Sequence, residues 1–287
     1  MYGFGGKEFV THVIINNFTF CKNMSNSLLL TAIEAATTAG AYLKQNVGKV
    51  RSIEQKFGQE KNLVTEIDQG SERIIIDIIR KQFPEHSILG EEGGQSAGAI
   101  SSVTWIIDPL DGTTNYTHGF PVFCVSIGVE VNGIIEVGVI YDPNVNDLFT
   151  AERGKGAFLN GERLHVSKSS SIGKSMLVTG FPYNIAENPN HAIEHFVNFL
   201  KISQAVRRMG SAAIDLAYVA AGRYDGYWEV SLKPWDMAAG ILLVEEAGGT
   251  VTNFSGRPVD LFGEEVLATN TLIHEEMLRV LALSNDL

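Results

Sequence analysis

The sequence predicts a layered protein of mixed α and β structure, between the α+β and α/β classes. The first half is expected to be mainly antiparallel, and strands and helices should alternate in the second. Two helical patterns come first, over residues 29–47 and 68–83. Residues 123–131 then alternate apolar with smaller or polar side chains, and the Asn-Gly pairs at 132–133 and 160–161 are typical of hairpins. Beyond residue 173, short apolar runs alternate with helical patterns, which favours a layered α/β arrangement.

Helical spacing and end signals define the first two predicted helices. The first ends near Gly48 and carries an apolar or small residue once per turn. These residues are Leu29, Ile33, Ala36, Gly40, Leu43 and Val47. The second begins near Asp68, carries a stripe of isoleucines opposite charged residues, and is closed by Pro84.

Short apolar runs predict the strands of the first half. Residues 87–89 and 105–107 indicate buried strands, and Pro109 is expected to end the second because it has no N–H to donate. Residues 123–131 and 134–141 flank Asn132-Gly133 and predict a hairpin, and 148–152 a further strand.

A polar Ser/Lys/Gly stretch at 167–173 is the predicted link between the two halves, and the second half is taken to start within it, at residue 169. The division gives two units, 24–168 and 169–287. Strands are expected at 176–179, 205–208 and 227–230 and around 251 and 266, and helices at 192–200, 211–221 and 234–247 and from 274.

The first 23 residues do not match the rest of the pattern. Their apolar residues come in short bursts, without the continuous apolar core of a secretory signal or the arginines of a transit peptide. Ser25-Asn26-Ser27 are good helix-capping residues. We therefore expect 1–23 to be an N-terminal extension outside the fold, with the working unit beginning near Met24.

Composition restricts the partners and the compartment. The formal net charge of −11 disfavours a nucleic-acid or anionic-membrane surface, which would need a basic patch. The two cysteines form no disulfide framework and favour the cytoplasm. No apolar run approaches the ~18 residues of a membrane helix. The sequence predicts a cytoplasmic enzyme without direct nucleic-acid or membrane contact.

The stretch 105–115, Trp-Ile-Ile-Asp-Pro-Leu-Asp-Gly-Thr-Thr-Asn, is the most informative part of the chain. Asp108 and Asp111 lie three residues apart where a buried strand should end. Carboxylates held so close repel each other unless one is protonated or a cation lies between them. The amides of Gly112 and Thr113 favour an anion such as phosphate. A divalent metal beside a phosphate pocket is one interpretation; turn and cap roles for the two aspartates are the other.

Three further acidic sites occupy comparable positions. Glu91-Glu92 follow a predicted strand, while Asp68 and Asp236 lie near the starts of predicted helices. Solvation of the glutamates and helix capping by the aspartates are the simpler explanations. Hard oxygen ligands without neighbouring histidine or cysteine favour Mg²⁺, with Mn²⁺ as a possible substitute, over zinc.

Three motifs in order resemble the signatures of inositol monophosphatases, in the lithium-sensitive, Mg²⁺-dependent phosphatase superfamily. They are Gly90-Glu91-Glu92, the stretch 105–115, and Trp235-Asp236 followed by Met-Ala-Ala-Gly. The resemblance runs from about Ser27 to the C-terminus. The runs 210–213 and 229–236 are similar to the bacterial branch. The resemblance implies an αβαβα sandwich, a homodimer and sensitivity to lithium.

The resemblance also implies metal ligands. A first ion is expected at Glu91, Asp108 and the backbone carbonyl of Leu110. A second is expected at Asp108, Asp111 and Asp236, so that Asp108 bridges the two.

Catalytic roles are carried over in the same way. Thr113, hydrogen-bonded to Asp68, would orient the attacking water, and the amides of Gly112 and Thr113 would hold phosphate. Glu92 would support a third, weaker ion near Glu91.

Substrate hydroxyls would contact Asp111, Ala212 and Glu229. The expected reaction is Mg²⁺-dependent hydrolysis of inositol 1-phosphate by metal-activated water. Other small esters remain open as substrates, namely fructose 1,6-bisphosphate, histidinol phosphate, NADP and 3′-phosphorylated adenosine nucleotides. A role as a protein that binds the transcription machinery, as in some bacterial relatives, is the alternative from a different class.

Overall fold

A computed structural model describes residues 7–50, 53–55, 63–96 and 102–282, with side chains for 27–50, 65–94 and 102–282. Its larger sheet has eight strands in the order β10-β9-β8-β7-β6-β5-β3-β4. All neighbours in it are antiparallel except β3 and β5. The strands are β3 (Ser87–Gly90), β4 (Gly94–Ser96), β5 (Val103–Asp111), β6 (Cys124–Val131), β7 (Ile134–Asp142), β8 (Asp147–Glu152), β9 (Gly156–Leu159) and β10 (Glu162–Arg163). The mainly antiparallel first half is thereby confirmed.

Both Asn-Gly pairs form the predicted hairpin turns. At Asn132-Gly133, φ is 52° and 82°, and at Asn160-Gly161 it is 50° and 84°. Two successive positive φ values match the right-handed twist of the flanking strands, which is why these dipeptides favour tight hairpins.

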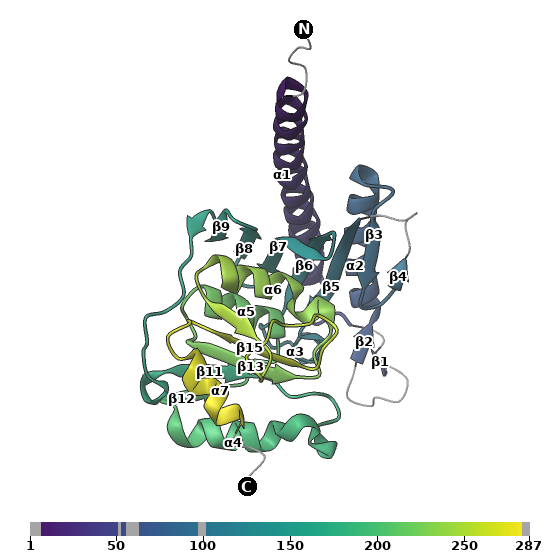
Figure 1. Ribbon diagram of the computed structural model, residues 1–287. Helices are drawn as coiled ribbons and strands as arrows, with labels where there is room; N and C mark the ends of the chain where they lie inside the picture. The colour runs from purple at the N-terminus through teal and green to yellow at the C-terminus, as the bar shows by residue number, and fades with distance from the viewer. Residues whose placement is uncertain (1–6, 51–52, 56–62, 97–101, 283–287) are drawn as a thin grey trace.

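Helices α1 (Lys7–Asn46) and α2 (Glu66–Gln82) cover one face of this sheet. From Leu28 onward the inward residues of α1 are buried in a core shared with α2 and the sheet. The helix begins at Lys7, so the start predicted at residues 25–27 is wrong. Good capping residues do not end a helix whose backbone hydrogen bonds continue through them. Figure 1 shows the N-terminal part of α1 projecting from the rest, and residues 1–6 lie outside the described residues.

Helices α5 (Ala212–Ala220) and α6 (Pro234–Glu246) form the middle layer, as Figure 1 shows. They bury their side chains against both sheets in one core. The smaller sheet has the order β12-β11-β13-β15-β14, from strands β11 (Met176–Thr179), β12 (Ala205–Arg207), β13 (Gly226–Val230), β14 (Thr250–Thr252) and β15 (Glu265–Thr269). Helices α4 (Ala192–Ile202) and α7 (His274–Ala282) cover its outer face. Five alternating layers confirm the predicted sandwich.

Several short elements complete the described part of the chain. They are β1 (Ile53–Gln55), paired with β2 (Leu63–Thr65), the helix α3 (Thr113–Thr117), and the 3₁₀ turns Ile172–Lys174, Ile185–Glu187 and Pro189–His191. Within these described ranges, no helix is both long and apolar enough to cross a membrane.

The strand β5 does not end before Pro109, contrary to the sequence prediction. It continues to Asp111, with Asp108 opposite Ser126 and Asp111 opposite Cys124. Two residues of β5 therefore face one of β6, which is a bulge, and a bulge tolerates a proline because its N–H is not needed there. The bulge keeps both aspartates at the end of one buried strand.

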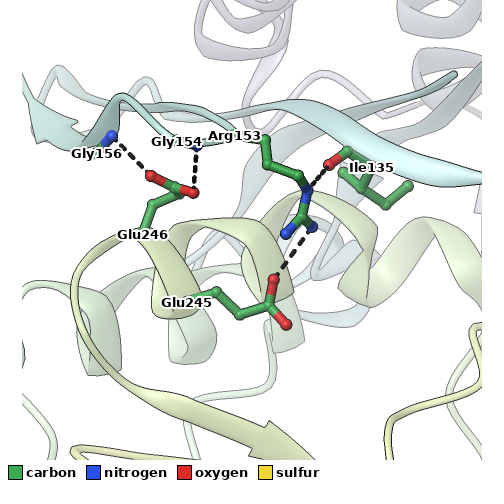
Figure 2. A network of polar contacts seen from close by, with 6 residues as sticks. All are labelled: Ile135, Arg153, Gly154, Gly156, Glu245 and Glu246. Atoms are coloured by element: carbon green, nitrogen blue, oxygen red, sulfur yellow. Dashed lines mark hydrogen bonds and ion pairs between the residues drawn. The ribbon is translucent and has the colours of Figure 1, made fainter.

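Two residues of α6, Glu245 and Glu246, tie the C-terminal end of this helix to the β8–β9 turn (Figure 2). Glu246 accepts hydrogen bonds from the backbone N–H groups of Gly154 and Gly156, each at 2.7 Å. Arg153 pairs with Glu245 at 3.1 Å and donates to the carbonyl of Ile135 at 2.7 Å. These contacts fix α6 on the larger sheet at the end opposite to the one that carries Asp236.

Candidate active site

A cavity of about 770 Å³ lies between the two sheets. Its walls come from the ends of β3, β5 and β13, from the starts of α3, α5 and α6, and from the segments around residues 180–187 and 262–264. Of the predicted site residues it is lined by Glu91, Asp108, Leu110, Asp111, Gly112, Thr113, Ala212, Glu229 and Asp236. Residues from both predicted units thus meet in one cavity.

Parallel pairing of β3 and β5 brings Glu91 beside Asp108. Gly90 is in register with Ile107, and Glu91 N–H donates to the carbonyl of Ile107 at 3.3 Å. Glu91 and Asp108 are therefore each the next residue after the paired Gly90 and Ile107. The predicted convergence of the two strand ends is present.

Charge at this end of the cavity is unbalanced. Burial raises the pKa of Asp108 well above its usual range, and nearby Glu91, Asp111 and Asp236 raise it further. Burial, then Glu91 and Asp111, raises the pKa of Asp236 in the same way. Four buried or half-buried carboxylates that destabilise one another's charge are the environment that a divalent cation relieves. Their hard oxygen atoms fit magnesium-type ions.

The carboxylates do not yet form a closed ligand set. Among the described residues, no three histidine, cysteine, aspartate or glutamate side chains are grouped closely enough to hold a metal ion in their present positions. Like charges in a low-dielectric cavity repel each other, so a bound cation would have to draw them inward.

Asp111 is held from the opposite half of the chain. Its Oδ2 accepts hydrogen bonds from Ser211 Oγ at 2.6 Å and from Ala213 N–H at 2.8 Å. Burial raises its pKa to about 6, and these hydrogen bonds limit the rise. No signal in the sequence indicated that Ser211 contacts the site, although a serine at the first residue of the predicted helix 211–221 is a signal of capping. Ser211 caps α5 and orients Asp111 at the same time.

Thr113 and Asp68 form the predicted pair. Thr113 Oγ1 lies 2.9 Å from Asp68 Oδ1 and 3.1 Å from the carbonyl of Leu110. Asp68 Oδ2 accepts from the backbone N–H of Thr65 at 2.9 Å, which completes the capping box of α2. Burial raises the pKa of Asp68 despite these hydrogen bonds. Asp68 is therefore both a helix cap and the partner of Thr113, so the two interpretations of this residue do not exclude each other.

Asp236 lines the cavity and also takes part in helix capping. It lies in the first turn of α6, after Pro234, and its Oδ2 accepts from Lys233 N–H at 2.7 Å. Pro234 begins this helix as predicted, because its fixed φ suits the first helical position.

Gly112 occupies a position that only glycine accepts without strain. Its φ is +93°, and a Cβ atom there would lie 2.9 Å from the carbonyl oxygen of Val122. Asn115 Nδ2 donates to that carbonyl and to the carbonyl of Met209, each at 2.8 Å. The turn between β5 and α3 is thus held close to the backbone of both halves.

Glu229 lies on β13 at the other wall of the cavity. Tyr227 OH donates to its Oε2 at 2.7 Å. Burial raises the pKa of Glu229 to about 7. Gly180 leaves the space that the carboxylate fills, because a Cβ there would overlap both carboxylate oxygens. No sequence signal identified Gly180, which lies far from β13 in the chain.

Two predicted catalytic residues are not part of the cavity wall. Asp68 is linked to the cavity by its hydrogen bond from Thr113, which lines it. Glu92 lies on the turn after β3, where its backbone N–H donates to Glu72 Oε1 at 3.1 Å. The role of Glu92 therefore stays a prediction.

Comparison with known proteins agrees with the geometry. The chain matches the inositol monophosphatase family over residues 24–285. It is 47% identical over 251 residues to an inositol-1-monophosphatase from Synechocystis sp., covering 88% of this chain and 87% of that protein. It is 43% identical over 251 residues to Nus factor SuhB from Salmonella typhimurium, covering 88% and 94%.

A solved structure supports the same assignment. The inositol monophosphatase from Anabaena (Nostoc) sp. PCC 7120 superposes with a TM-score of 0.80 at 44% identity, over 90% of this chain and 96% of that one. Family members are phosphatases that use metal ions, and the cavity described above has the acidic residues for both properties. The chain belongs to the inositol monophosphatase family.

Proposed function

We propose that this protein is a Mg²⁺-dependent phosphomonoesterase that hydrolyses inositol 1-phosphate to inositol and phosphate. The observation that carries the proposal is the convergence of Glu91, Asp108, Asp111 and Asp236 on one cavity beside the Thr113–Asp68 pair. Hard carboxylate oxygens favour Mg²⁺, with Mn²⁺ as a possible substitute.

Two ions have candidate ligands in this cavity. Glu91, Asp108 and the carbonyl of Leu110 would hold one, and Asp108, Asp111 and Asp236 the other. When bound, a pair of such ions lowers the pKa of water and stabilises the attacking and leaving oxygens. A third, more weakly bound ion would lie near Glu91, supported by Glu92.

The chain itself positions the nucleophile. Thr113 Oγ1 donates to Asp68, so its lone pairs are free to accept a hydrogen bond from a water molecule in the cavity. A threonine hydroxyl is too weak a base to remove a proton, so Thr113 orients the water. The amides of Gly112 and Thr113 are the proposed donors to phosphate, on a turn that is held rigid by close backbone contacts.

The second wall would receive the alcohol. Asp111, Ala212 and Glu229 are the proposed contacts to inositol hydroxyls, and all three line the cavity. The name of the Synechocystis relative supports inositol phosphate as the substrate. The name of the Salmonella relative refers to a Nus factor, so resemblance alone does not choose the substrate.

A panel of phosphate esters tests the proposal. Phosphate release is measured with inositol 1-phosphate, fructose 1,6-bisphosphate, histidinol phosphate, NADP and a 3′-phosphorylated adenosine nucleotide. We expect the highest kcat/KM for inositol 1-phosphate, loss of turnover in EDTA, and recovery with Mg²⁺ or Mn²⁺. A higher kcat/KM for another ester would overturn the substrate, and full turnover in EDTA would overturn the metal dependence.

Two further properties are also proposals. A homodimer is expected from the family resemblance, and sedimentation of the purified chain tests it. A cytoplasmic location follows from the cysteine content and the charge, and fractionation of the source cells tests it.

A further inference from the structure

Asp215 is a buried carboxylate for which the proposed mechanism has no use. It lies on α5, is 1% exposed, and lines the cavity. Its Oδ1 has no hydrogen-bond partner. Asp215 is thus an unpaired acceptor at the site where a ligand would bind.

Protein stability does not explain this residue. Burying an unpaired carboxylate is unfavourable, because water is lost and no hydrogen bond replaces it. Burial, followed by repulsion from Glu229 and Asp111, raises the pKa of Asp215 well above its usual range, and the attraction of Arg208 lowers it only in part. No ion pair between Arg208 and Asp215 is present in the described part of the chain. Capping of α5 does not need Asp215 either, since Ser211 caps that helix.

The position of Asp215 relates it to the proposed alcohol site. It follows Ala212 by three residues on α5, so the two lie next to each other on one face of the helix. The other two acidic residues of this wall already have protein partners. Asp111 Oδ2 accepts from Ser211 and Ala213, and Glu229 Oε2 accepts from Tyr227.

The chemistry of a carboxylate limits what Asp215 can bind. In either protonation state at least one carboxyl oxygen of Asp215 carries no hydrogen and only accepts hydrogen bonds, so the partner of that oxygen must be a donor. The phosphate end of the substrate is an anionic acceptor, which three neighbouring carboxylates repel. A hydroxyl of the alcohol part is a neutral donor and satisfies Asp215 without adding charge to the wall.

We propose that Asp215 is a specificity-determining residue, which accepts a hydrogen bond from a hydroxyl on the alcohol part of the substrate. The site then selects phosphate esters of polyhydroxylated alcohols over esters of alcohols without further hydroxyls. The inference rests on the proposed phosphomonoesterase function and adds the residue that recognises the alcohol.

The test compares two substrates in three variants of the full-length protein. The variants are Asp215→Ala, Asp215→Asn and, as a control, Asp142→Asn. Asp142 is a buried carboxylate outside the cavity wall and accepts from Asn144 at 2.8 Å. The substrates are inositol 1-phosphate and phenyl phosphate, which has no hydroxyl beyond the ester.

For Asp215→Ala we expect a loss of kcat/KM of about 10- to 100-fold on inositol 1-phosphate, the range for a hydrogen bond to a charged group. On phenyl phosphate we expect a change of less than about twofold, since that substrate has no hydroxyl to lose. Asp215→Asn keeps one acceptor oxygen and should lie between wild type and Asp215→Ala on inositol 1-phosphate. The control should change both substrates equally.

Equal losses on the two substrates would overturn the assignment of Asp215, because a structural role does not distinguish them. No loss on inositol 1-phosphate would also overturn it. Failure of the proposed function is seen separately, in the wild type alone, as no Mg²⁺-dependent release of phosphate from inositol 1-phosphate. In that case the polyhydroxylated ester with the highest kcat/KM in the panel replaces it, and a wild type that hydrolyses no such ester overturns the inference.

Discussion

The two walls of the cavity differ in how their polar groups are satisfied. On the wall from β3, β5 and α3, Asp108 accepts a hydrogen bond from the backbone N–H of Leu110, two positions away in the chain. Asp68, which lies outside the wall, contacts Thr113 and accepts a hydrogen bond from Thr65, three positions away. On the wall from α5 and β13, Glu229 depends on space left by Gly180, far away in the sequence, and Asp215 Oδ1 has no hydrogen-bond partner. Apart from the hydrogen bonds of Ser211 and Ala213 to Asp111, the first wall is held by short-range contacts, and it lacks positive charge. The second is a tertiary structure that lacks a hydrogen-bond donor.

This difference suggests separate duties. Hydrogen bonds from nearby residues hold Asp108 and Asp236, and long-range ones from Ser211 and Ala213 hold Asp111. These carboxylates repel one another, so a cation completes the first wall. Long-range packing shapes the second wall, so an uncharged donor such as a hydroxyl completes it. Variants in the first wall should change turnover and metal affinity, whereas variants in the second should change substrate selection.

Asp108→Asn should have the largest effect. Asp108 is the proposed bridge between two ions, so its loss removes charge from both sites. We expect kcat to fall by more than about 10⁴-fold and Mg²⁺ affinity to weaken. Phosphate release measures the first change, and calorimetric titration measures the second. Unchanged Mg²⁺ affinity would show that Asp108 is not a ligand.

Thr113→Ala should separate orientation from metal binding within the first wall. The variant removes the hydroxyl that contacts Asp68 and leaves all proposed metal ligands in place. We expect kcat to fall by about 10²–10⁴-fold, as for other positioned proton-transfer groups, with Mg²⁺ affinity retained. Thr113→Ser keeps the hydroxyl and should recover most of the turnover. A Thr113→Ala variant that loses Mg²⁺ would contradict the orienting role.

Gly180→Ala should damage the second wall alone. The added methyl group overlaps the carboxylate of Glu229, which must move and lose its hydrogen bond from Tyr227. We expect kcat/KM for inositol 1-phosphate to fall by about 10- to 100-fold, with unchanged Mg²⁺ affinity.

Gly173→Ala is the matched control for that variant. Its Cβ would lie 3.7 Å from the nearest atom, the carbonyl oxygen of Ile202, which is ordinary contact. A similar loss of kcat/KM in both variants would refute the proposed role of Gly180.

Stability should fall with rising pH in the metal-free protein. The pKa of Glu229 is about 7 in the folded protein against 4.5 for an unperturbed glutamate, so the folded state holds the proton more tightly. Between these values the folded state binds more protons than the unfolded chain. The free energy of unfolding should decrease by at most about 1.4 kcal/mol per pH unit from this group.

Urea denaturation in EDTA across that range measures this slope. Glu229→Gln removes the titrating group and should make the slope shallower, although Asp111, with a pKa of about 6, contributes in the same direction. If the free energy of unfolding depends on pH with the same slope in Glu229→Gln as in the wild type, Glu229 is not the group that binds the proton.

Deletion of residues 1–23 should have the smallest effect. Both walls are built by residues after Thr65, and the buried residues of α1 described in the core, from Leu28 to Leu43, all lie beyond residue 23. We expect kcat/KM and the melting temperature to stay within error of the full chain. A clear drop in either would mean that the extension is part of the working unit.

Most secondary structure could be predicted from the sequence because its causes are local. The two Asn-Gly turns, the capping role of Asp68 in the first turn of α2, and the start of α6 at Pro234 each depend on residues within one turn. The acidic residues at the cavity were found in the same way, because each follows a strand or begins a helix.

Only the tertiary structure decided how those residues are held. The bulge that carries β5 past Pro109 depends on pairing with β6, and the orientation of Asp111 depends on Ser211, 100 residues further along. Burial likewise depends on every layer at once. Burial raises the pKa of Glu229 and leaves Asp215 Oδ1 without a hydrogen-bond partner. Neither effect has a cause within a few residues of the chain.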